Sequence, residues 1–147
     1  MEHLNIGNLV RIKGKEGNWR VSGIGYRKGD EDVYHFSLVG DGEGKIVSMK
    51  KGMIGEKVEG IEIGKVFLGD NGFIHGEGEG EDKWREMRRE IGDRESVLLY
   101  DLVGKNFVIK NYGDIVREGK CEYIHEMQDM ISESGNDDIG RTMVLKG

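Results

Sequence analysis

The stretch VYHFSLVG, residues 33–40, decides the fold because its apolar and polar side chains alternate. Tyr34, Phe36 and Leu38 fall on one side of an extended chain, with polar residues between them. Alternation with a period of two is typical of a strand that buries one face. We therefore predict a strand here, followed after a glycine-rich turn by a returning strand at 45–49.

The same order of blocks occurs twice along the chain. VLLYDLVG at 97–104 echoes 33–40 and also precedes an apolar segment, at 105–110. Upstream of these blocks, IGNLV at residues 6–10 is echoed by IGKVF at residues 63–67. Such self-similarity predicts that one small β-module is duplicated.

Other segments extend the β pattern. The first half predicts strands at 9–13 and 19–24, with a bulge or a bend at Gly23 and Gly25, because glycine inside a strand often marks one or the other. In the second half, the apolar runs predict strands at 58–63, 65–68, 73–75, 96–103, 105–111, 114–117 and 141–146.

Two segments have helical spacing. Trp84, Met87 and Ile91 stand at i, i+3 and i+7, which predicts a helix over 81–91 that ends before a glycine. Ile124, at the same spacing from later apolar residues, predicts a second helix over 121–132. A strand at 121–125 stays open as the alternative.

The sequence thus predicts a mainly β (α+β) protein made of two related small β-barrel or curled-sheet modules with one or two short helices. The first module spans 1–55. The second spans 56–135, with the helix at 81–91 as an insertion, and 136–147 forms a tail or terminal strand. We expect the modules to pack as one compact unit.

The composition supports this class and hints at the origin of the chain. Among 147 residues there are 25 glycines and neither alanine nor proline. A chain without the best helix former leans towards strands and turns. Such a biased composition also fits a viral or mobile-element accessory protein.

The number of cysteines and the net charge limit where the protein can be located and which partners it can bind. Cys121 is the only cysteine, which excludes an intramolecular disulfide and fits a reducing compartment. No apolar run approaches the roughly 20 residues that cross a bilayer, and the first residues do not resemble a signal peptide. We expect a cytoplasmic protein. The net charge of −6 disfavours general binding to polyanions.

Candidate reactive residues are few. Cys121 and His125 would be neighbours on a helix and could pair as thiolate and base, but no third partner is legible. The four histidines are scattered, and the acidic loop at 77–82 lacks the EF-hand order. We therefore predict no catalytic residue, no metal site and no cofactor. Cation binding by the acidic loop is left open.

The candidate binding surface is the aromatic and basic rim of the first module: Trp19, Tyr26, Arg27 and Lys28. Aromatic rings among cations also suit single-stranded nucleic acid, which is one alternative. A second alternative places a small anionic or nucleotide-like ligand between the modules, within reach of Trp84 and Arg88.

Three short patterns carry a resemblance to a known class: Gly7-x-x-Val10-x-Ile12, Trp19-x-Val21-x-x-Ile24 and Tyr34-x-Phe36-x-Leu38. Over roughly residues 6–50 the chain resembles small SH3-like or Tudor-like β-barrels. It is also similar to uncharacterised prokaryotic proteins with a duplicated β-module. The resemblance implies a barrel but carries no function and no site residue.

The sequence therefore predicts a non-enzymatic binding or interaction protein. A protein partner is expected first, with nucleic acid or a small anionic ligand as alternatives and no membrane association. Exposed strand edges in such modules often pair across a two-fold axis, so a homo-oligomer is also expected.

Overall fold

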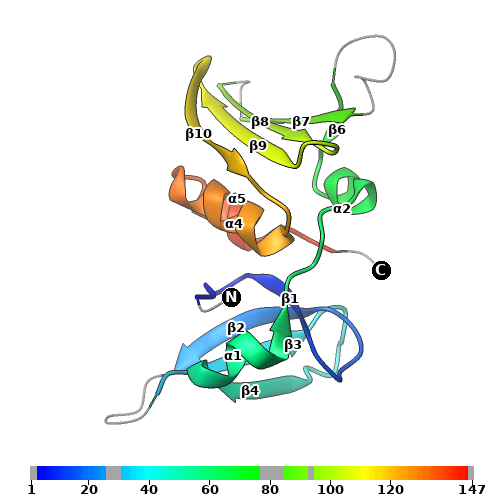
Figure 1. Cartoon of the computed structure of the whole chain (residues 1–147), viewed down its shortest axis with the longest axis vertical. Helices are drawn as coiled ribbons and strands as arrows, with labels where there is room; N and C mark the ends of the chain where they lie inside the picture. The colour runs from blue at the N-terminus through cyan, green and yellow to red at the C-terminus, as the bar shows by residue number, and fades with distance from the viewer. Residues whose placement is uncertain (1–2, 26–30, 77–84, 93–94, 146–147) are drawn as a thin grey trace. The chain divides into compact units, whose positions relative to one another are not determined.

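The protein consists of two units, each built around one antiparallel sheet. The computed structural model describes residues 3–25, 31–76, 85–92 and 95–145. The chain divides into Met1–Ile61 and Glu62–Lys146, here called unit 1 and unit 2. Each contains a five-stranded sheet, together with a few short helices (Figure 1). The predicted mainly β class is confirmed.

In unit 1, consecutive strands are neighbours until the last one returns to the first. The elements are β1 (Leu9–Ile12), β2 (Trp19–Gly25), β3 (Val33–Leu38), β4 (Ile46–Lys50), α1 (Lys51–Lys57) and β5 (Val58–Glu59). The strand order is β4-β3-β2-β1-β5, so β1 pairs with strands on both of its sides. The short helix α1 carries the chain from one sheet edge to the other.

The core of unit 1 follows the predicted alternation. Tyr34 is 5% exposed and Phe36 is fully buried, while the intervening His35 lies on the other face. The pairing of β2 with β3 shifts register between Val21 and Gly23. This confirms a bulge at Gly23, where the absence of a side chain tolerates the extra residue.

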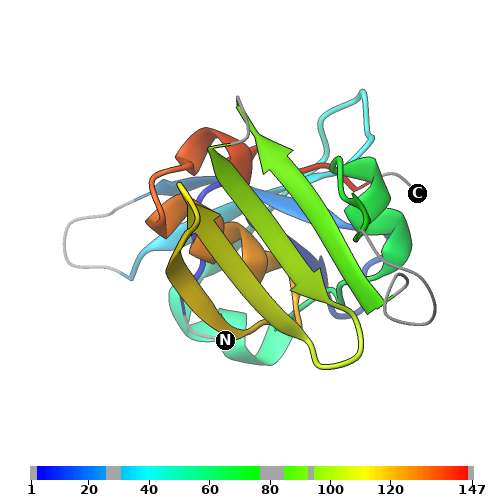
Figure 2. The ribbon, with the colours of Figure 1, turned by 90° about the horizontal axis from the view of Figure 1, so that it is seen from above.

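In unit 2 the sheet is a plain meander. The strands are β6 (Ile74–His75), β7 (Glu86–Ile91), β8 (Ser96–Asp101), β9 (Asn106–Asn111) and β10 (Asp114–Lys120), in the spatial order β10-β9-β8-β7-β6. Figure 2 shows the longer strands side by side, in green to yellow. The strands predicted at 96–103, 105–111 and 114–117 are confirmed with small shifts of their ends.

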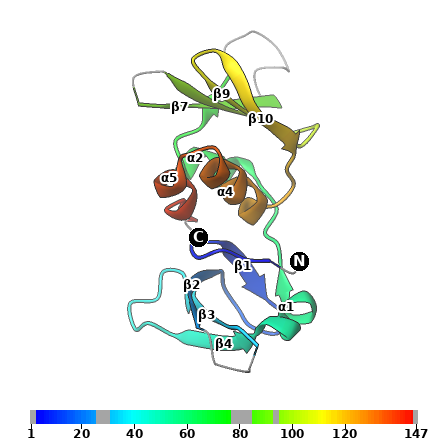
Figure 3. The same cartoon turned by 90° about the vertical axis from the view of Figure 1, so that its left-hand side faces the viewer.

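Helices lie along one face of this second sheet. They are α2 (Lys65–Asp70), α4 (Ile124–Glu133) and α5 (Asp137–Arg141), and α4 and α5 lie below the strands in Figures 1 and 3. Ile124, Met127 and Ile131 of α4 have no exposed surface. The helix predicted at 121–132 is therefore confirmed, and the strand alternative is wrong for the residues from Ile124 onward.

Helices α4 and α5 approach each other so closely that only glycine fits at the contact. A side-chain carbon on Gly140 would lie 2.6 Å from the carbonyl oxygen of Gln128. The Gln128 side-chain amide donates a hydrogen bond of 3.0 Å to the carbonyl oxygen of Gly140. The two residues thus fasten α5 to α4.

The helix predicted over 81–91 is wrong for its described part. Residues 86–91 form β7, which pairs with β8 through six residue pairs. The spacing of Met87 and Ile91 fits a strand as well as a helix, because both are odd-numbered positions on one strand face. Cross-strand pairing then decided the outcome. Residues 81–84 lie outside the described residues.

The strand predicted at 65–68 is also wrong, because these residues open α2. Phe67 and Leu68 are both buried, whereas Val66 is 70% exposed. A strand would have put Phe67 and Leu68 on opposite faces, whereas one helix turn buries both neighbours. The echo between residues 6–10 and 63–67 is therefore not a structural repeat. The other echo does join two strands, β3 and β8.

Two further segments depart from expectation. The strand predicted at 141–146 does not form in its described part, because α5 continues to Arg141 and no strand follows. Instead, the Asn71 side chain accepts a hydrogen bond from the backbone N–H of Val144 and donates one to its carbonyl, each 2.7 Å long. Helix α1 was not expected at all, since its glycines and lysines carry no helical signature. None of the described helices is long and apolar enough to cross a lipid bilayer.

The contact at Gly140 gives a test of the packing between α4 and α5. We expect Gly140→Ala to lower the free energy of unfolding by about 1–3 kcal/mol, because an added methyl group overpacks the contact. Gly42→Ala is the matched control, since no atom lies within 4 Å of its added carbon. Urea unfolding followed by circular dichroism measures both, and an equal effect of the two changes would contradict this packing.

Candidate functional site

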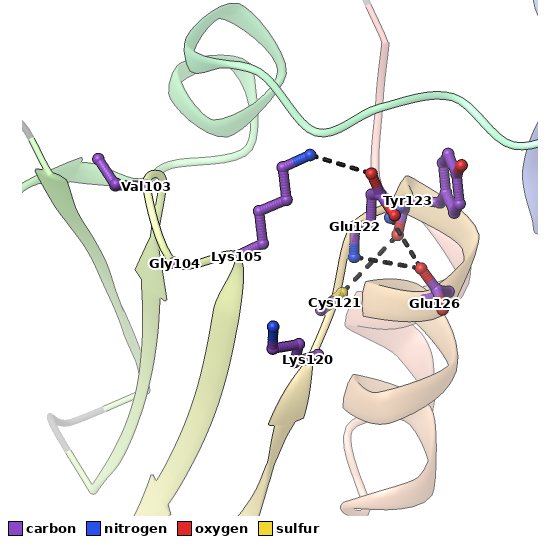
Figure 4. A pocket seen from close by; sticks show the side chains of 8 residues that line it. All are labelled: Val103, Gly104, Lys105, Lys120, Cys121, Glu122, Tyr123 and Glu126. Carbon is purple, nitrogen blue, oxygen red and sulfur yellow. Dashed lines mark hydrogen bonds and ion pairs between the residues drawn. The ribbon is translucent and has the colours of Figure 1, made fainter.

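A hollow in unit 2 lies at one end of its sheet, where the β8–β9 turn meets the link between β10 and α4. It is a cleft of about 410 Å³. Its lining residues, drawn in Figure 4, are Val103, Gly104, Lys105, Lys120, Cys121, Glu122, Tyr123 and Glu126. We refer to it as the turn cleft.

One wall of the turn cleft is shaped by the carboxylate of Asp101, the last residue of β8. Its Oδ1 atom accepts hydrogen bonds of 3.0 Å from the backbone N–H groups of Val103 and Gly104. The Nε–H of Arg85 donates to both carboxylate oxygens, at 3.0 and 3.1 Å. Arg85 and the two N–H groups together hold the pKa of Asp101 below its usual value.

This arrangement constrains the residues that follow. A side-chain carbon on Gly104 would lie 2.9 Å from Asp101 Oδ2, so the turn can close over the carboxylate only with glycine there. Lys105 then adopts a left-handed conformation with φ of 53°, which is uncommon for a residue with a side chain. The strained backbone directs the Lys105 side chain across the cleft (Figure 4).

The opposite wall is held by hydrogen bonds to the first wall and to the core. The buried Tyr100 hydroxyl donates a hydrogen bond of 2.7 Å to the carbonyl oxygen of Cys121. The backbone N–H of Cys121 donates to the carbonyl oxygen of Lys105, at 2.8 Å. Because a buried hydroxyl without a partner would be costly, Tyr100 favours a single position of this wall.

Charged groups bridge and cap the turn cleft. Lys105 Nζ lies 3.0 Å from Glu122 Oε1, and this ion pair raises the pKa of Lys105. The Glu126 carboxylate accepts hydrogen bonds from the backbone N–H groups of Tyr123 and Glu122, at 2.9 and 3.1 Å. A carboxylate that reaches back in this way satisfies the open amides at the start of α4.

The cysteine and histidine that sequence analysis singled out do not bond to each other. The Cys121 thiol donates a long hydrogen bond, 3.7 Å, to the carbonyl oxygen of Tyr123. Burial raises the pKa of this thiol well above its usual value, and Glu126 adds to the shift. His125 stacks on the Tyr123 ring, and burial lowers the pKa of its imidazole. A neutral thiol is a poor nucleophile.

The binding residues predicted from the sequence lie elsewhere. Trp19 is 4% exposed and belongs to the core of unit 1. Arg88 lies on β7, with its side chain on the sheet face opposite to buried Met87, and pairs with Glu90 at 3.0 Å.

The other four predicted binding residues, Tyr26, Arg27, Lys28 and Trp84, lie outside the described residues, as does the acidic loop at 77–82. The structure therefore does not bring the predicted set together. Those predictions stay predictions.

Sequence reasoning missed the residues that line the turn cleft. Lys105 and Lys120 look like ordinary strand-end lysines, and Glu122 looks like a surface carboxylate. The one available signal was Glu126, three residues after Tyr123, which has the spacing of a helix-capping glutamate. It marks where α4 begins but does not reveal that a turn 20 residues earlier faces it.

Comparison with known proteins does not assign the site. No protein-family model matches this chain, and neither the curated proteins nor the solved structures provide a match. Within the described residues, no three histidine, cysteine, aspartate or glutamate side chains form a group that could hold a metal ion. The function is therefore inferred from the geometry of the turn cleft.

Asp101 gives a test of how the β8–β9 turn is held. We expect Asp101→Ala to lower the free energy of unfolding by about 1–2 kcal/mol, because two backbone N–H groups and Arg85 lose their acceptor. Asp101→Asn keeps one acceptor oxygen and is expected to cost less. Thermal unfolding followed by circular dichroism compares the three proteins.

The difference in stability between the wild type and Asp101→Asn should depend on pH in a defined direction. Because the pKa of Asp101 is lower in the folded than in the unfolded state, its stabilisation is complete above about pH 5 and fades as the pH falls below about 4. The stability gap between the wild type and Asp101→Asn should therefore shrink in acid. A gap that widens in acid would contradict the assigned role.

Cys121 gives a test of the state of the turn cleft. At about pH 8 the native thiol should react with iodoacetamide at least tenfold more slowly than an exposed thiol, because burial keeps it protonated and covered. A variant carrying both Cys121→Ser and Ser22→Cys supplies the exposed reference. Mass spectrometry measures labelling, and rapid labelling of native Cys121 would show that it is an accessible thiolate.

Proposed function

We propose that this protein is a non-enzymatic interaction protein and that the turn cleft is where a protein partner is recognised. The observation that carries the proposal is that both walls are fixed before any ligand arrives. Asp101 holds one wall, and Tyr100 holds the other. A preformed site loses little conformational entropy when it binds, which favours affinity.

The state of the reactive groups supports binding over catalysis. A cysteine nucleophile needs a lowered pKa, and burial moves the pKa of Cys121 the other way. A lysine nucleophile also needs a lowered pKa, and the ion pair with Glu122 raises that of Lys105. Glu126 is occupied by two backbone N–H groups. Each group is therefore held in its unreactive form.

The exposed groups of the turn cleft indicate the chemistry of the partner. Lys120 is exposed and forms no ion pair with a described residue. Val103 is 73% exposed at the rim. A cleft lined by a cation and an apolar side chain is complementary to a partner segment that carries both a carboxylate and an apolar residue.

Unit 1 supports the same class of protein. We propose that it is a small SH3-like or Tudor-like barrel. The support is that a five-stranded antiparallel sheet in a chain segment of this length buries Val10, Trp19 and Phe36 in one core.

The rim of Trp19, Tyr26, Arg27 and Lys28 stays a predicted second contact surface, as does the site for a small anionic ligand near Trp84 and Arg88. Nucleic-acid binding is less well supported. Bases stack on exposed aromatic rings, but Trp19, Tyr34 and Phe36 are all at most 5% exposed.

A homo-oligomer and a viral or mobile-element accessory role also stay predictions. The strand edge best suited to self-association is that of β10, whose Ile115 is 55% exposed. The register shift between Ile115 and Arg117 interrupts that edge and opposes simple strand addition.

A charge reversal in the turn cleft tests the proposed function. Tagged wild-type protein and the Lys120→Glu variant are used to capture partners from cells of the source organism, and the captured proteins are quantified by mass spectrometry. We expect at least one partner to be depleted about tenfold or more with Lys120→Glu, because an unpaired like charge at an interface costs a few kcal/mol. Lys120 has no ionic partner to lose among the described residues, so the variant should fold normally.

Lys15→Glu is the matched control, because it makes the same charge change at an exposed turn of unit 1. Its captured proteins should equal those of the wild type. Equal capture by all three proteins would overturn the assignment of the turn cleft. Tight binding to a single-stranded oligonucleotide that falls steeply with salt would instead support the nucleic-acid alternative.

A further inference from the structure

Unit 2 contains a second, smaller cavity, lined by the end of α2, by β7 and by residues of and after α5. Its volume is about 280 Å³, and it is lined by Asp70, Asn71, Gly72, Arg89, Ile139, Thr142 and Met143. This is slightly below the range typical of pockets for drug-sized molecules, and it suits a metabolite of a few heavy atoms. It shares no residue with the turn cleft.

Arg89 places a positive charge in this cavity. In β7 it stands opposite Leu98, which has no exposed surface, so its side chain lies on the sheet face that carries the core. Burial lowers the pKa of Arg89, and no carboxylate offsets that effect. The guanidinium forms no ion pair with a described residue. A partly buried charge without a partner is costly and marks a place where an anion would be stabilised.

Asp70 places a negative charge in the same cavity. It is the last residue of α2, and its Oδ2 atom is buried without a hydrogen-bond partner among the described residues. Asp70 and Arg89 do not form an ion pair with each other in the structure. The cavity therefore presents an acceptor and a cation, and neither has an ion-pair partner within the part of the chain that the structure describes.

The other polar side chains of the cavity are occupied by the protein itself. Asn71 bonds to the carbonyl oxygens of Phe67 and Val144 and accepts the N–H of Val144. The Thr142 hydroxyl donates to the carbonyl oxygen of Asp138. Gly72, with φ of 85°, leaves space beside the guanidinium, since a side-chain carbon there would lie 3.5 Å from Arg89 Nε.

We propose that this cavity binds a small zwitterion of the α-amino acid class. Its carboxylate would pair with Arg89, its ammonium group with Asp70, and its apolar side chain would contact Ile139 and Met143. Asp70 disfavours a simple anion and Arg89 disfavours a simple cation, whereas one molecule that carries both charges satisfies both residues. The proposal is independent of the function assigned to the turn cleft.

Ligand-dependent thermal unfolding of the full chain tests the proposal. L-leucine at about 10 mM should raise the midpoint of unfolding in a concentration-dependent way, because a ligand that binds only the folded state stabilises it. N-acetyl-L-leucine lacks the ammonium charge and L-leucinamide lacks the carboxylate. Each should bind about tenfold or more weakly than L-leucine, as measured by isothermal titration calorimetry.

Substitutions in the cavity identify the site. Arg89→Gln and Asp70→Asn should each abolish the response to L-leucine while leaving a cooperative unfolding transition. Lys110→Gln, which removes a positive charge from β9 on the opposite sheet face, is the matched control and should respond like the wild type. The proposal is overturned if the wild type shows no response to L-leucine, if the three ligands act equally, or if Arg89→Gln responds unchanged.

Discussion

Two consecutive side chains at the end of β8 hold the turn cleft together. Because neighbouring residues on a strand point to opposite faces, Tyr100 enters the core while Asp101 faces the turn. Tyr100 bonds to the carbonyl of Cys121, and Asp101 gathers the N–H groups of the turn that presents Lys105. Segments far apart in sequence thus depend on one strand end for their mutual position.

The turn cleft contains groups of the types that react in many enzymes, but their surroundings here do not activate Cys121 or Lys105. A thiol, an amine and a carboxylate line the same cleft. The Cys121 thiol is buried, the Lys105 amine is paired with Glu122, and the Glu126 carboxylate accepts backbone hydrogen bonds. Functional sites often shift pKa values towards reactivity. Here the pKa values of Cys121 and Lys105 both move away from reactivity, which supports the proposal that the turn cleft binds a partner.

The sequence predicted secondary structure correctly where the pattern of apolar residues was compatible with a strand but not with a helix. The alternation through Tyr34 and Phe36 identified β3, and the echo of that block together with apolar runs identified β8 and β9. It failed at 65–68, because a short apolar run is compatible with strand and helix alike, and at 86–91, because pairing with β8 outweighed helical spacing. These outcomes depend on contacts with distant segments, which a local pattern does not contain. The turn cleft was missed for the same reason, since Lys105 and Glu122 meet only after folding.

The bond between Asn71 and Val144 bears on how the chain folds as it is synthesised. Every sheet partner of unit 1 lies within the first 61 residues, so its strands can assemble while the remainder is still being translated. Asn71 must instead wait for a segment 73 residues downstream. Until then, the side-chain carbonyl and N–H groups of Asn71 lack their hydrogen bonds to the backbone of Val144. Unit 2 is thus completed later in synthesis than unit 1.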